Sequence, residues 1–365
     1  MRILHTESSC GWGGQEIRIL TEAAGMLARG HQVTILACPN SNIYPAALER
    51  GIPAVALPIE KKRVGSLLAM RGWLARHKHE FDVINTHSST DAWLVAVAGA
   101  TLSGVPPVVR TRHVSTDINR SATTRWLYLN ATRHIVTTGE RLRKTLNRDN
   151  GFPLNRMTSI PTGVDLERFT PPLSRSAARA RLGLADKPTL GILATLRNWK
   201  GHGYLFDAWP ALTERFPDWQ LLIVGDGPQR QNLERRVLEA GWTNVIFAGN
   251  RDDVPDWLAA MDLFTLPSYG NEGVPQGIMQ AMACGLPVVS TPVGAIAEAV
   301  LDGQTGTLVP PQDAKALTEA LATLMGDAAQ RQRYASAGLA HARTTFGLER
   351  MLDRMEAVFG AAIAR

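Results

Sequence analysis

The sequence predicts an α/β protein of two doubly wound, Rossmann-like domains that face a central cleft. Two observations carry this prediction. A chain of 365 residues is too long for one ordinary hydrophobic core. Short apolar runs also alternate with helix-length segments throughout, which is typical of parallel sheets covered by helices on both faces. Ligands of such sheets bind outside the carboxyl ends of the strands, so a binding site is expected in the loops that follow them.

The apolar runs give the expected elements in chain order. The strands of the first half are Arg2–His5, Gln32–Ala37, Pro53–Leu57, Val83–Thr86, Val108–Arg112 and His134–Thr138. Those of the second half are Thr189–Leu193, Gln220–Val224, Val245–Phe247, Leu263–Leu266 and Val288–Ser290. Helices are expected at segments such as Glu16–Arg29 and Ala92–Leu102, and at Leu348–Ile363, whose apolar residues recur at helical spacing. Two prolines in Phe169–Ser174 predict a boundary between domains 1–170 and 171–347.

Composition narrows the class of protein. With 45% apolar and 20% charged residues, the chain reads as soluble and globular, and it has no apolar run of about 18 residues that would predict a transmembrane helix. The start, Met1–Glu7, predicts a first strand rather than a signal peptide. Cys10, Cys38 and Cys284 have neither metal-ligand spacing nor a disulfide framework, which fits a reducing cytoplasm.

Positive charge is concentrated in the first half. Residues 1–170 hold 21 Lys and Arg against 13 Asp and Glu, whereas residues 171–365 hold 18 against 20. The basic run Lys61–Lys78 carries apolar residues among its cations. Such a segment can lie on an anionic membrane surface, or it can pack its apolar stripe on the sheet of its own domain. Nucleic acid is not expected as a partner, because no nucleic-acid motif or exposed aromatic series accompanies the charge.

The segment Asn271–Thr291 predicts an anion site. It follows a strand-like run, opens with Glu272 in a loop rich in glycine and proline, and continues into an expected helix from Gly277 to Cys284. The free N–H groups and the dipole at a helix N-terminus stabilise a phosphate without a lysine. Glu272 can accept hydrogen bonds from sugar hydroxyls, and Gln280 can bond a second hydroxylated group. The alternative is an ordinary β-loop-α unit with a polar loop.

This segment resembles the donor-binding motif of retaining glycosyltransferases of family 4, EGxPxxxxEAMAxGxPVV. Here it reads Glu272-Gly-Val-Pro-Gln-Gly-Ile-Met-Gln280-Ala-Met-Ala-Cys-Gly-Leu-Pro-Val-Val. In the family, the first Glu binds the transferred sugar and the second holds the nucleotide ribose. The resemblance therefore makes Glu272 catalytic and assigns the donor to Gly273, Val274, Pro275, Gln276 and Gln280. Gln280 departs from the family's Glu: it keeps an acceptor oxygen but loses the charged bidentate grip.

The resemblance covers nearly the whole chain and implies the two-domain GT-B fold. In that fold the last helix crosses back, so residues 348–365 are expected on the N-terminal, acceptor-binding domain. Residues 171–347 then form the nucleotide-sugar-binding domain.

Two further segments resemble phosphate-binding parts of the family. Gly11–Glu16 follows the first strand and is similar to a GGAER-like loop near the donor diphosphate, which makes Gly13 and Gly14 candidates. Arg197-Asn-Trp-Lys200-Gly is similar to GRLxxxKG, whose Arg and Lys bind the donor phosphates, although Arg197 stands closer to Lys200 than in the family. Two cations after a strand can neutralise a leaving diphosphate; a solvated surface pair is the alternative.

Loops after other strands supply the remaining candidates. His87 follows Val83–Thr86, where family members often have a histidine that contacts the donor sugar. His113 ends another strand and is a candidate to bind the acceptor with Arg110 and Arg112. The remaining candidates come from the resemblance: Gly163, in an NGVD-like segment, is expected near the phosphates, and the family seats the base near Asn250 and Arg251.

These segments together predict a glycosyltransferase that moves a sugar from a nucleotide-diphosphate sugar to a lipid-linked or lipopolysaccharide acceptor. By the resemblance, its setting is cell-envelope glycan synthesis, in the cytoplasm or peripherally on the inner face of the cytoplasmic membrane. The chain has no Asp-x-Asp pair, which argues for transfer without a metal ion, and no other cofactor is expected. Two rivals stay open: a sugar-nucleotide epimerase of similar fold, and a non-catalytic nucleotide-sugar binding protein, which Gln280 keeps open.

Overall fold

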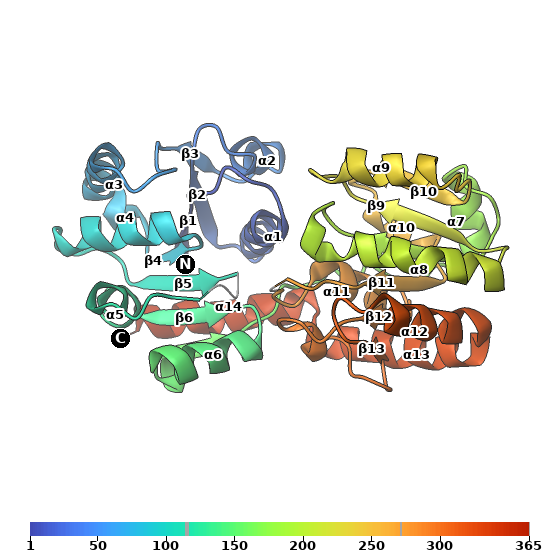
Figure 1. Cartoon of the computed structure of the whole chain (residues 1–365). Helices are drawn as coiled ribbons and strands as arrows, with labels where there is room; N and C mark the ends of the chain where they lie inside the picture. The colour runs from blue at the N-terminus through green and yellow to red at the C-terminus, as the bar shows by residue number, and fades with distance from the viewer. Residues whose placement is uncertain (114–116, 271, 365) are drawn as a thin grey trace. The chain divides into compact units, whose positions relative to one another are not determined.

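The computed structural model describes residues 1–113, 117–270 and 272–364, and it divides into two compact units (Figure 1). The first unit contains Met1–Gly163 and the chain from Leu348 onward, and the second contains Val164–Gly347. The boundary expected at residue 170 is therefore too late. The N–H of Val164 donates to the carbonyl of Phe346 at 2.7 Å, so the chain pairs with the second unit as soon as it leaves Gly163.

The first unit is built on a parallel sheet in the order β3-β2-β1-β4-β5-β6-β7. Helices lie on both faces of this sheet (Figure 1). Strand β1 pairs with β2 on one side and with β4 on the other, so the direction of the crossovers reverses between β1 and β4. The elements are β1 (Arg2–Glu7), α1 (Gly14–Ala28), β2 (Gln32–Ala37), α2 (Ile43–Glu49), β3 (Ala54–Ala56), α3 (Val64–His77), η1 (Lys78–Glu80), β4 (Val83–Thr86), α4 (Ser89–Ala100), β5 (Val108–Arg112), α5 (Ala122–Leu129), β6 (His134–Thr137), α6 (Glu140–Asn150), η2 (Leu154–Arg156), β7 (Met157–Ser159) and α14 (Leu348–Ile363).

The second unit repeats the same parallel topology, with the order β10-β9-β8-β11-β12-β13. Here the reversal falls between β8 and β11, which pair with each other. The elements are α7 (Arg175–Arg181), β8 (Thr189–Leu193), η3 (Asn198–Lys200), α8 (His202–Arg215), β9 (Gln220–Val224), α9 (Arg230–Glu239), β10 (Val245–Gly249), α10 (Val254–Ala259), β11 (Leu263–Leu266), α11 (Gln276–Ala283), β12 (Val288–Ser290), η4 (Ile296–Glu298), β13 (Gly306–Leu308), α12 (Ala314–Gly326) and α13 (Ala328–Thr345).

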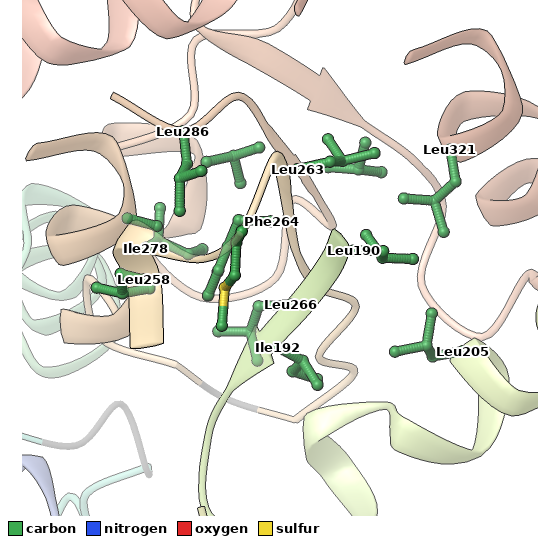
Figure 2. Close-up of a cluster of buried hydrophobic side chains, with 14 of the residues drawn as sticks. Leu190, Ile192, Leu205, Leu258, Leu263, Phe264, Leu266, Ile278, Leu286 and Leu321 are labelled. Atoms are coloured by element: carbon green, nitrogen blue, oxygen red, sulfur yellow. The ribbon is translucent and has the colours of Figure 1, made fainter. Parts of the chain in front are cut away.

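The core of the second unit holds its central strands between two helical layers. All residues of β9 and β11 are buried, which is why these strands read as continuous apolar runs. Figure 2 shows Leu258 and Ile278 to one side of Phe264, and Leu205 and Leu321 on the opposite side. Because Ile278 is fully buried in this core and α11 contacts β11 and β12, the helix is fixed against the sheet.

Helix α14, red in Figure 1, completes the core of the first unit. It contacts α1, β4 and β5. Gly25 of α1 allows the close approach, because a Cβ atom there would lie 2.5 Å from Cδ1 of Leu352. The buried side chains recur at helical spacing: Met351, Leu352, Met355, Val358, Phe359 and Ala362. Among the described helices of both units, none is long and apolar enough to cross a membrane.

The contribution of α14 is testable with a matched pair of truncations on the same helix. Phe359 is 0% exposed and Ile363 is 39% exposed. Phe359→Ala should lower the free energy of unfolding by about 3–5 kcal/mol, because it removes a buried side chain and leaves a cavity. Ile363→Ala should lower the free energy of unfolding by less than about 1 kcal/mol. Thermal unfolding measures both; equal losses would contradict a core role for α14.

Candidate active site

The candidate site of the second unit lies between β8 and β11, where the connections change from one face of the sheet to the other. Lys200 ends the turn that follows β8, and Glu272 lies in the loop that follows β11. Because β8 and β11 are neighbours in a parallel sheet, their carboxyl ends lie at one edge and bring these distant residues together. Asn271, where the predicted motif begins, lies outside the described residues.

Lys200 and Glu272 form a largely buried ion pair. The Nζ of Lys200 lies 2.6 Å from Oε1 of Glu272, and the two side chains are 18% and 9% exposed. The hydroxyl of Ser268 donates to the same Oε1 atom at 2.8 Å. Such a pair contributes little net stability, because desolvation of the two charges offsets their attraction. Its effect is to hold a carboxylate and an ammonium group in fixed orientation at the strand ends.

Two glycines allow the loops to approach this closely. Gly294 has φ +56°, and a Cβ atom there would lie 2.0 Å from the carbonyl oxygen of Glu272. The N–H of Ala295 then donates to that same oxygen at 3.1 Å, which fixes the backbone of Glu272. Gly201 has φ +83°, and its Cβ position would overlap the carbonyl oxygen of Pro267 at 2.0 Å. Any other residue at either position would separate the loops that carry Lys200 and Glu272.

Helix α11 begins directly after this loop. Pro275 is its N-cap, and no side chain caps it. A Cβ atom on Gly277 would lie 2.7 Å from the carbonyl oxygen of Leu193, so the first turn is pressed against the end of β8. The loop residues Gly273 and Val274 lead into this turn, and Gln276 is its first residue. The helix terminus, with its positive dipole end, therefore lies beside the Lys200–Glu272 pair.

The other predicted residues of this unit are more dispersed. Gln280 lies one turn along α11 and is partly buried. Arg197 is exposed, and its guanidinium lies over the ring of Trp199 at 5.1 Å. Asn250 and Arg251 are exposed after β10, the edge strand, and Arg251 lies over the Trp257 ring at 4.6 Å. The structure thus brings Lys200, Glu272 and the start of α11 together, and it gives Arg197 and Arg251 aromatic partners instead.

In the first unit, three histidines lie in contact with one another at β1 and at the ends of β4 and β5. Nδ1 of His5 lies 2.9 Å from Nε2 of His87, and Nδ1 of His87 lies 2.9 Å from Nε2 of His113. Burial is the main cause that lowers the pKa of each ring, to about 3 for His5 and well below the ordinary value for His87 and His113. Both ring nitrogens of His87 are therefore occupied by other histidines, which differs from the expected direct contact between His87 and a sugar.

Beside the histidines lies a pair of buried carboxyl groups. Glu7 accepts hydrogen bonds from Ser88 and Gln15, and Asp91 accepts from the Thr6 hydroxyl at 2.8 Å. Burial, and then the proximity of Asp91, raises the pKa of Glu7 to about 8. Burial also raises the pKa of Asp91 to about 6, although hydrogen bonds from Thr6 and the backbone of His87 favour its ionised form. Burial at these strand ends therefore opposes the ionised form of Glu7, although the hydrogen bonds that its two oxygens accept from Ser9, Gln15 and Ser88 favour that form.

The predicted arginines lie on β5, next to this cluster. Nη1 of Arg110 donates to the Ser88 carbonyl at 3.2 Å, and its guanidinium lies 4.9 Å from the centre of the Tyr128 ring. Nη1 of Arg112 donates to the Tyr128 hydroxyl at 3.0 Å. Burial raises the pKa of Tyr128, but the two guanidiniums outweigh it, so the net shift is downward. Both arginines are buried, at 2% and 7% exposed.

The predicted glycines of the first unit have different surroundings. Gly13 is the N-cap of α1, and Gly14 is its first residue, so both lie at a helix N-terminus as expected. Gly163 is not in a left-handed turn. Its N–H lies 3.0 Å from the Met351 sulfur, and a Cβ atom on it would lie 2.7 Å from Cα of Leu348. Glycine at 163 is thus required by packing against α14.

Comparison with known proteins places this geometry in a family. Residues 12–168 match the family described as Glycosyltransferase Family 4, and residues 187–327 match Glycosyl transferases group 1. The phosphatidyl-myo-inositol mannosyltransferase of Mycobacterium leprae is 31% identical over 352 residues, which cover 89% of this chain and 87% of that protein. The chain belongs to glycosyltransferase family 4.

Two further proteins are similar to this chain, one in sequence and one in fold. The lipopolysaccharide core biosynthesis mannosyltransferase LpsB of Rhizobium meliloti is 35% identical over 211 residues, which are 55% of this chain and 60% of that protein. The chain spans about half the length of some other curated relatives that it matches. The crystal structure of Anabaena Alr3699/HepE in complex with UDP has a TM-score of 0.86 at 22% identity, covering 99% of this chain and 100% of that one. The predicted GT-B fold is confirmed.

Several residues of this family 4 chain were not predicted from the sequence. Glu7, Asp91 and His5 join the first site, and Gly294 supports the second. His202, which follows Lys200 and Gly201, is 2% exposed, and neither of its ring nitrogens has a partner among the described residues. Burial lowers its pKa to about 4. Across the described ranges, no three His, Cys, Asp or Glu side chains gather so that they could hold a metal ion.

Gly294 provides a test of the loop geometry, with Gly303 as the matched control. Both have a positive φ, +56° and +69°, but nothing lies within 4 Å of a Cβ atom at Gly303. Gly303→Ala should lower the free energy of unfolding by about 1–2 kcal/mol, because it adds only the strain of a left-handed backbone at a residue with a Cβ atom. Gly294→Ala adds a clash with Glu272 and should lower the melting temperature by about 4 °C more. Equal melting temperatures for the two variants would show that the loop relaxes without strain.

Proposed function

We propose that this chain transfers a hexose from a nucleotide-diphosphate sugar to a lipid-linked or lipopolysaccharide acceptor, with retention of configuration. The observation that carries the proposal is the Lys200–Glu272 ion pair beside the N-terminus of α11. The names of the relatives support the acceptor class, since one concerns lipopolysaccharide core biosynthesis and another phosphatidyl-myo-inositol. Both are mannosyltransferases, so mannose is the sugar to test first.

In the proposed reaction, groups of the second unit hold the donor. The bond between the anomeric carbon and the donor phosphate breaks, and the acceptor oxygen bonds to the same face of the sugar. The acceptor proton passes to the leaving phosphate, so no protein nucleophile is required. Lys200 and the first turn of α11 stabilise the negative charge that develops on the leaving diphosphate. Glu272 accepts hydrogen bonds from the sugar hydroxyls and orients the ring.

Transfer in this scheme uses no metal ion or other cofactor. The charge on the diphosphate is met by Lys200 and by the N–H groups of α11, and the sequence lacks the paired aspartates that hold a divalent ion on a sugar nucleotide. Gln280 would hold the ribose through a neutral amide in place of the family's carboxylate. Asn250 and Arg251 remain proposed base contacts.

Removing the charge of Glu272 tests the site assignment. Glu272→Gln should lower kcat about 10²-fold or more, a loss of the size found when one oriented polar group of an active site is removed. Glu239→Gln is the matched control, because Glu239 is an exposed carboxylate at the end of α9 in the same unit. The assay follows transfer of labelled mannose from its nucleotide diphosphate to a lipid acceptor, with thermal unfolding as a check of the fold.

The same assay separates the alternatives. Transfer that Glu272→Gln leaves unchanged would contradict the assigned site. Conversion of the donor without acceptor would identify an epimerase, and tight donor binding without turnover would identify a binding protein. Loss of transfer on addition of EDTA would contradict the metal-independent scheme, whereas a panel of UDP, GDP and ADP sugars selects the base.

Helix α3 supports a proposed peripheral contact with an anionic membrane. Its residues Met70, Trp73 and Leu74 are buried in the core with strands of the first unit, as expected for an ordinary surface helix. Val64 and Leu68, however, are 75% and 62% exposed. Lys61, Arg63 and other exposed cations flank these two residues. An exposed apolar pair surrounded by positive charge suits a surface of anionic lipid.

Vesicle binding tests this proposed contact. Lys61→Gln/Arg63→Gln should weaken binding to anionic vesicles about 30-fold, since each cation near such a surface contributes about 1 kcal/mol. Lys144→Gln/Arg148→Gln removes two exposed cations from α6 and serves as the control. Co-sedimentation with phosphatidylglycerol vesicles measures both. Equal binding by the two double variants would show that α3 is an ordinary surface helix.

A further inference from the structure

A cavity of the first unit lies apart from the candidate site. It has a volume of about 310 Å³ and lies between α14 and the strands β6 and β7. His134, the first residue of β6, lines it together with Asn155 of η2, which precedes β7, so the cavity reaches the amino ends of these strands. The candidate site gathers instead at the carboxyl ends of strands in the same parallel sheet. These ends form the opposite edge of the sheet, so the two places are separate.

The course of α14 explains why this space is open. The helix packs on α1, β4 and β5, whereas the cavity lies further along the sheet, beside β6 and the edge strand β7. Arg354, Ala357 and Ala361 line it from the helix and recur at helical spacing, so they share one face. The two alanines are exposed and carry only methyl groups, so they leave room beside the sheet. On the sheet side, Nε2 of His134 lies 2.8 Å from Oγ1 of Thr158.

Positive charge without a matching carboxylate distinguishes this cavity. Arg133, which is exposed, and Arg354, which is partly buried, both line it. Among the described residues that line it, none is acidic, and neither arginine has a carboxylate oxygen within the 4.0 Å of an ion pair in the described ranges. A guanidinium binds a carboxylate or a phosphate through two parallel hydrogen bonds, so these side chains are suited to an oxyanion.

The surroundings of Arg354 oppose its charge. Burial, followed by the charge of Arg350, lowers the pKa of Arg354. Glu140 has the opposite effect, but it already forms an ion pair with Nη1 of Arg143 at 2.8 Å. A partly buried cation is stabilised by an anion at close range. A negatively charged ligand in the cavity therefore supplies what the neighbouring side chains do not.

We propose that this cavity binds a small organic anion, a carboxylate or phosphate monoester on a short apolar body. Arg133 and Arg354 bind the oxyanion, and the apolar body packs on Ala357 and Ala361. The volume lies at the small end of the range for ligand pockets, which suits a short body and not a long acyl chain. Such binding is independent of the proposed transfer reaction, because the cavity lies at the opposite edge of the sheet.

Calorimetric titration of the full chain with short-chain probes tests the class of ligand. Hexyl phosphate and hexanoate should bind. Hexanol, which has the chain without the charge, and hexylamine, which carries the opposite charge, should bind at least about tenfold more weakly, because they lose the charge-assisted hydrogen bonds. Equal binding of hexanol or hexylamine would overturn the proposal, as would the absence of binding by both anions.

A matched pair of arginine variants tests where the anion binds. Arg354→Gln should weaken the binding of hexyl phosphate about tenfold or more, because it removes a charged hydrogen-bond donor from the cavity. Arg350→Gln changes an exposed arginine one turn earlier on α14 that does not line the cavity, and it should weaken binding less than about threefold. Thermal unfolding of each variant checks that the fold is kept.

A second pair tests the shape of the cavity. Ala361→Leu fills the space beside the helix and should weaken the binding of hexyl phosphate at least about tenfold. Ala364→Leu adds the same side chain at an exposed residue outside the cavity and should leave binding unchanged. Unchanged binding in both Arg354→Gln and Ala361→Leu would overturn the proposal. So would a loss of binding confined to Lys200→Gln, which would place the phosphate at the proposed donor site instead.

Discussion

Both candidate sites depend on one constraint, the reversal of crossover direction in a parallel sheet. Between β1 and β4, and again between β8 and β11, the loops that follow neighbouring strands lead to opposite faces. The strand ends at these points are not covered by a crossover, so polar side chains can gather there. Elsewhere along each sheet, helices on both faces require apolar strands, and the buried runs of β9 and β11 meet that requirement.

The two sites stabilise their buried polar groups in different ways. The second unit pairs opposite charges, Lys200 with Glu272, and holds them with a serine hydroxyl and a glycine contact. In the first unit, burial instead opposes ionisation: it raises the pKa of Glu7 and lowers the pKa of each of the three histidines. Paired charges suit the diphosphate donor that we propose, whereas neutral rings in contact hold the strand ends together without net charge.

The sequence predicted most of the framework, because buried strands of parallel sheets are short and continuously apolar. Strands such as Gln220–Val224 were predicted with the bounds found in the structure. β7 and β13 were missed, since each has three residues and is only partly buried. The boundary was misplaced because Pro171 and its neighbours, read as a linker, pack against Gly285 within the second unit.

The sequence predicted the arrangement of the site residues less completely than it predicted the fold. Motif similarity indicated Glu272 and Lys200, but nothing in the spacing of positions 5, 87 and 113 indicates that three imidazoles are in contact. That contact depends on strand order and on burial, which a one-dimensional pattern does not carry. The same holds for Gly163, whose role is a steric one against a helix that lies far away in the chain.

The position of α14 in the first unit has a consequence for synthesis on the ribosome. Residues 164–347 form a self-contained unit that is complete before α14 emerges. The sheet of residues 1–163, although made first, keeps the part of one apolar face that α14 covers exposed until Phe359 and its neighbours are translated. The nascent chain therefore completes its second half before its first, and the exposed face is a site for chaperones or for aggregation during that interval.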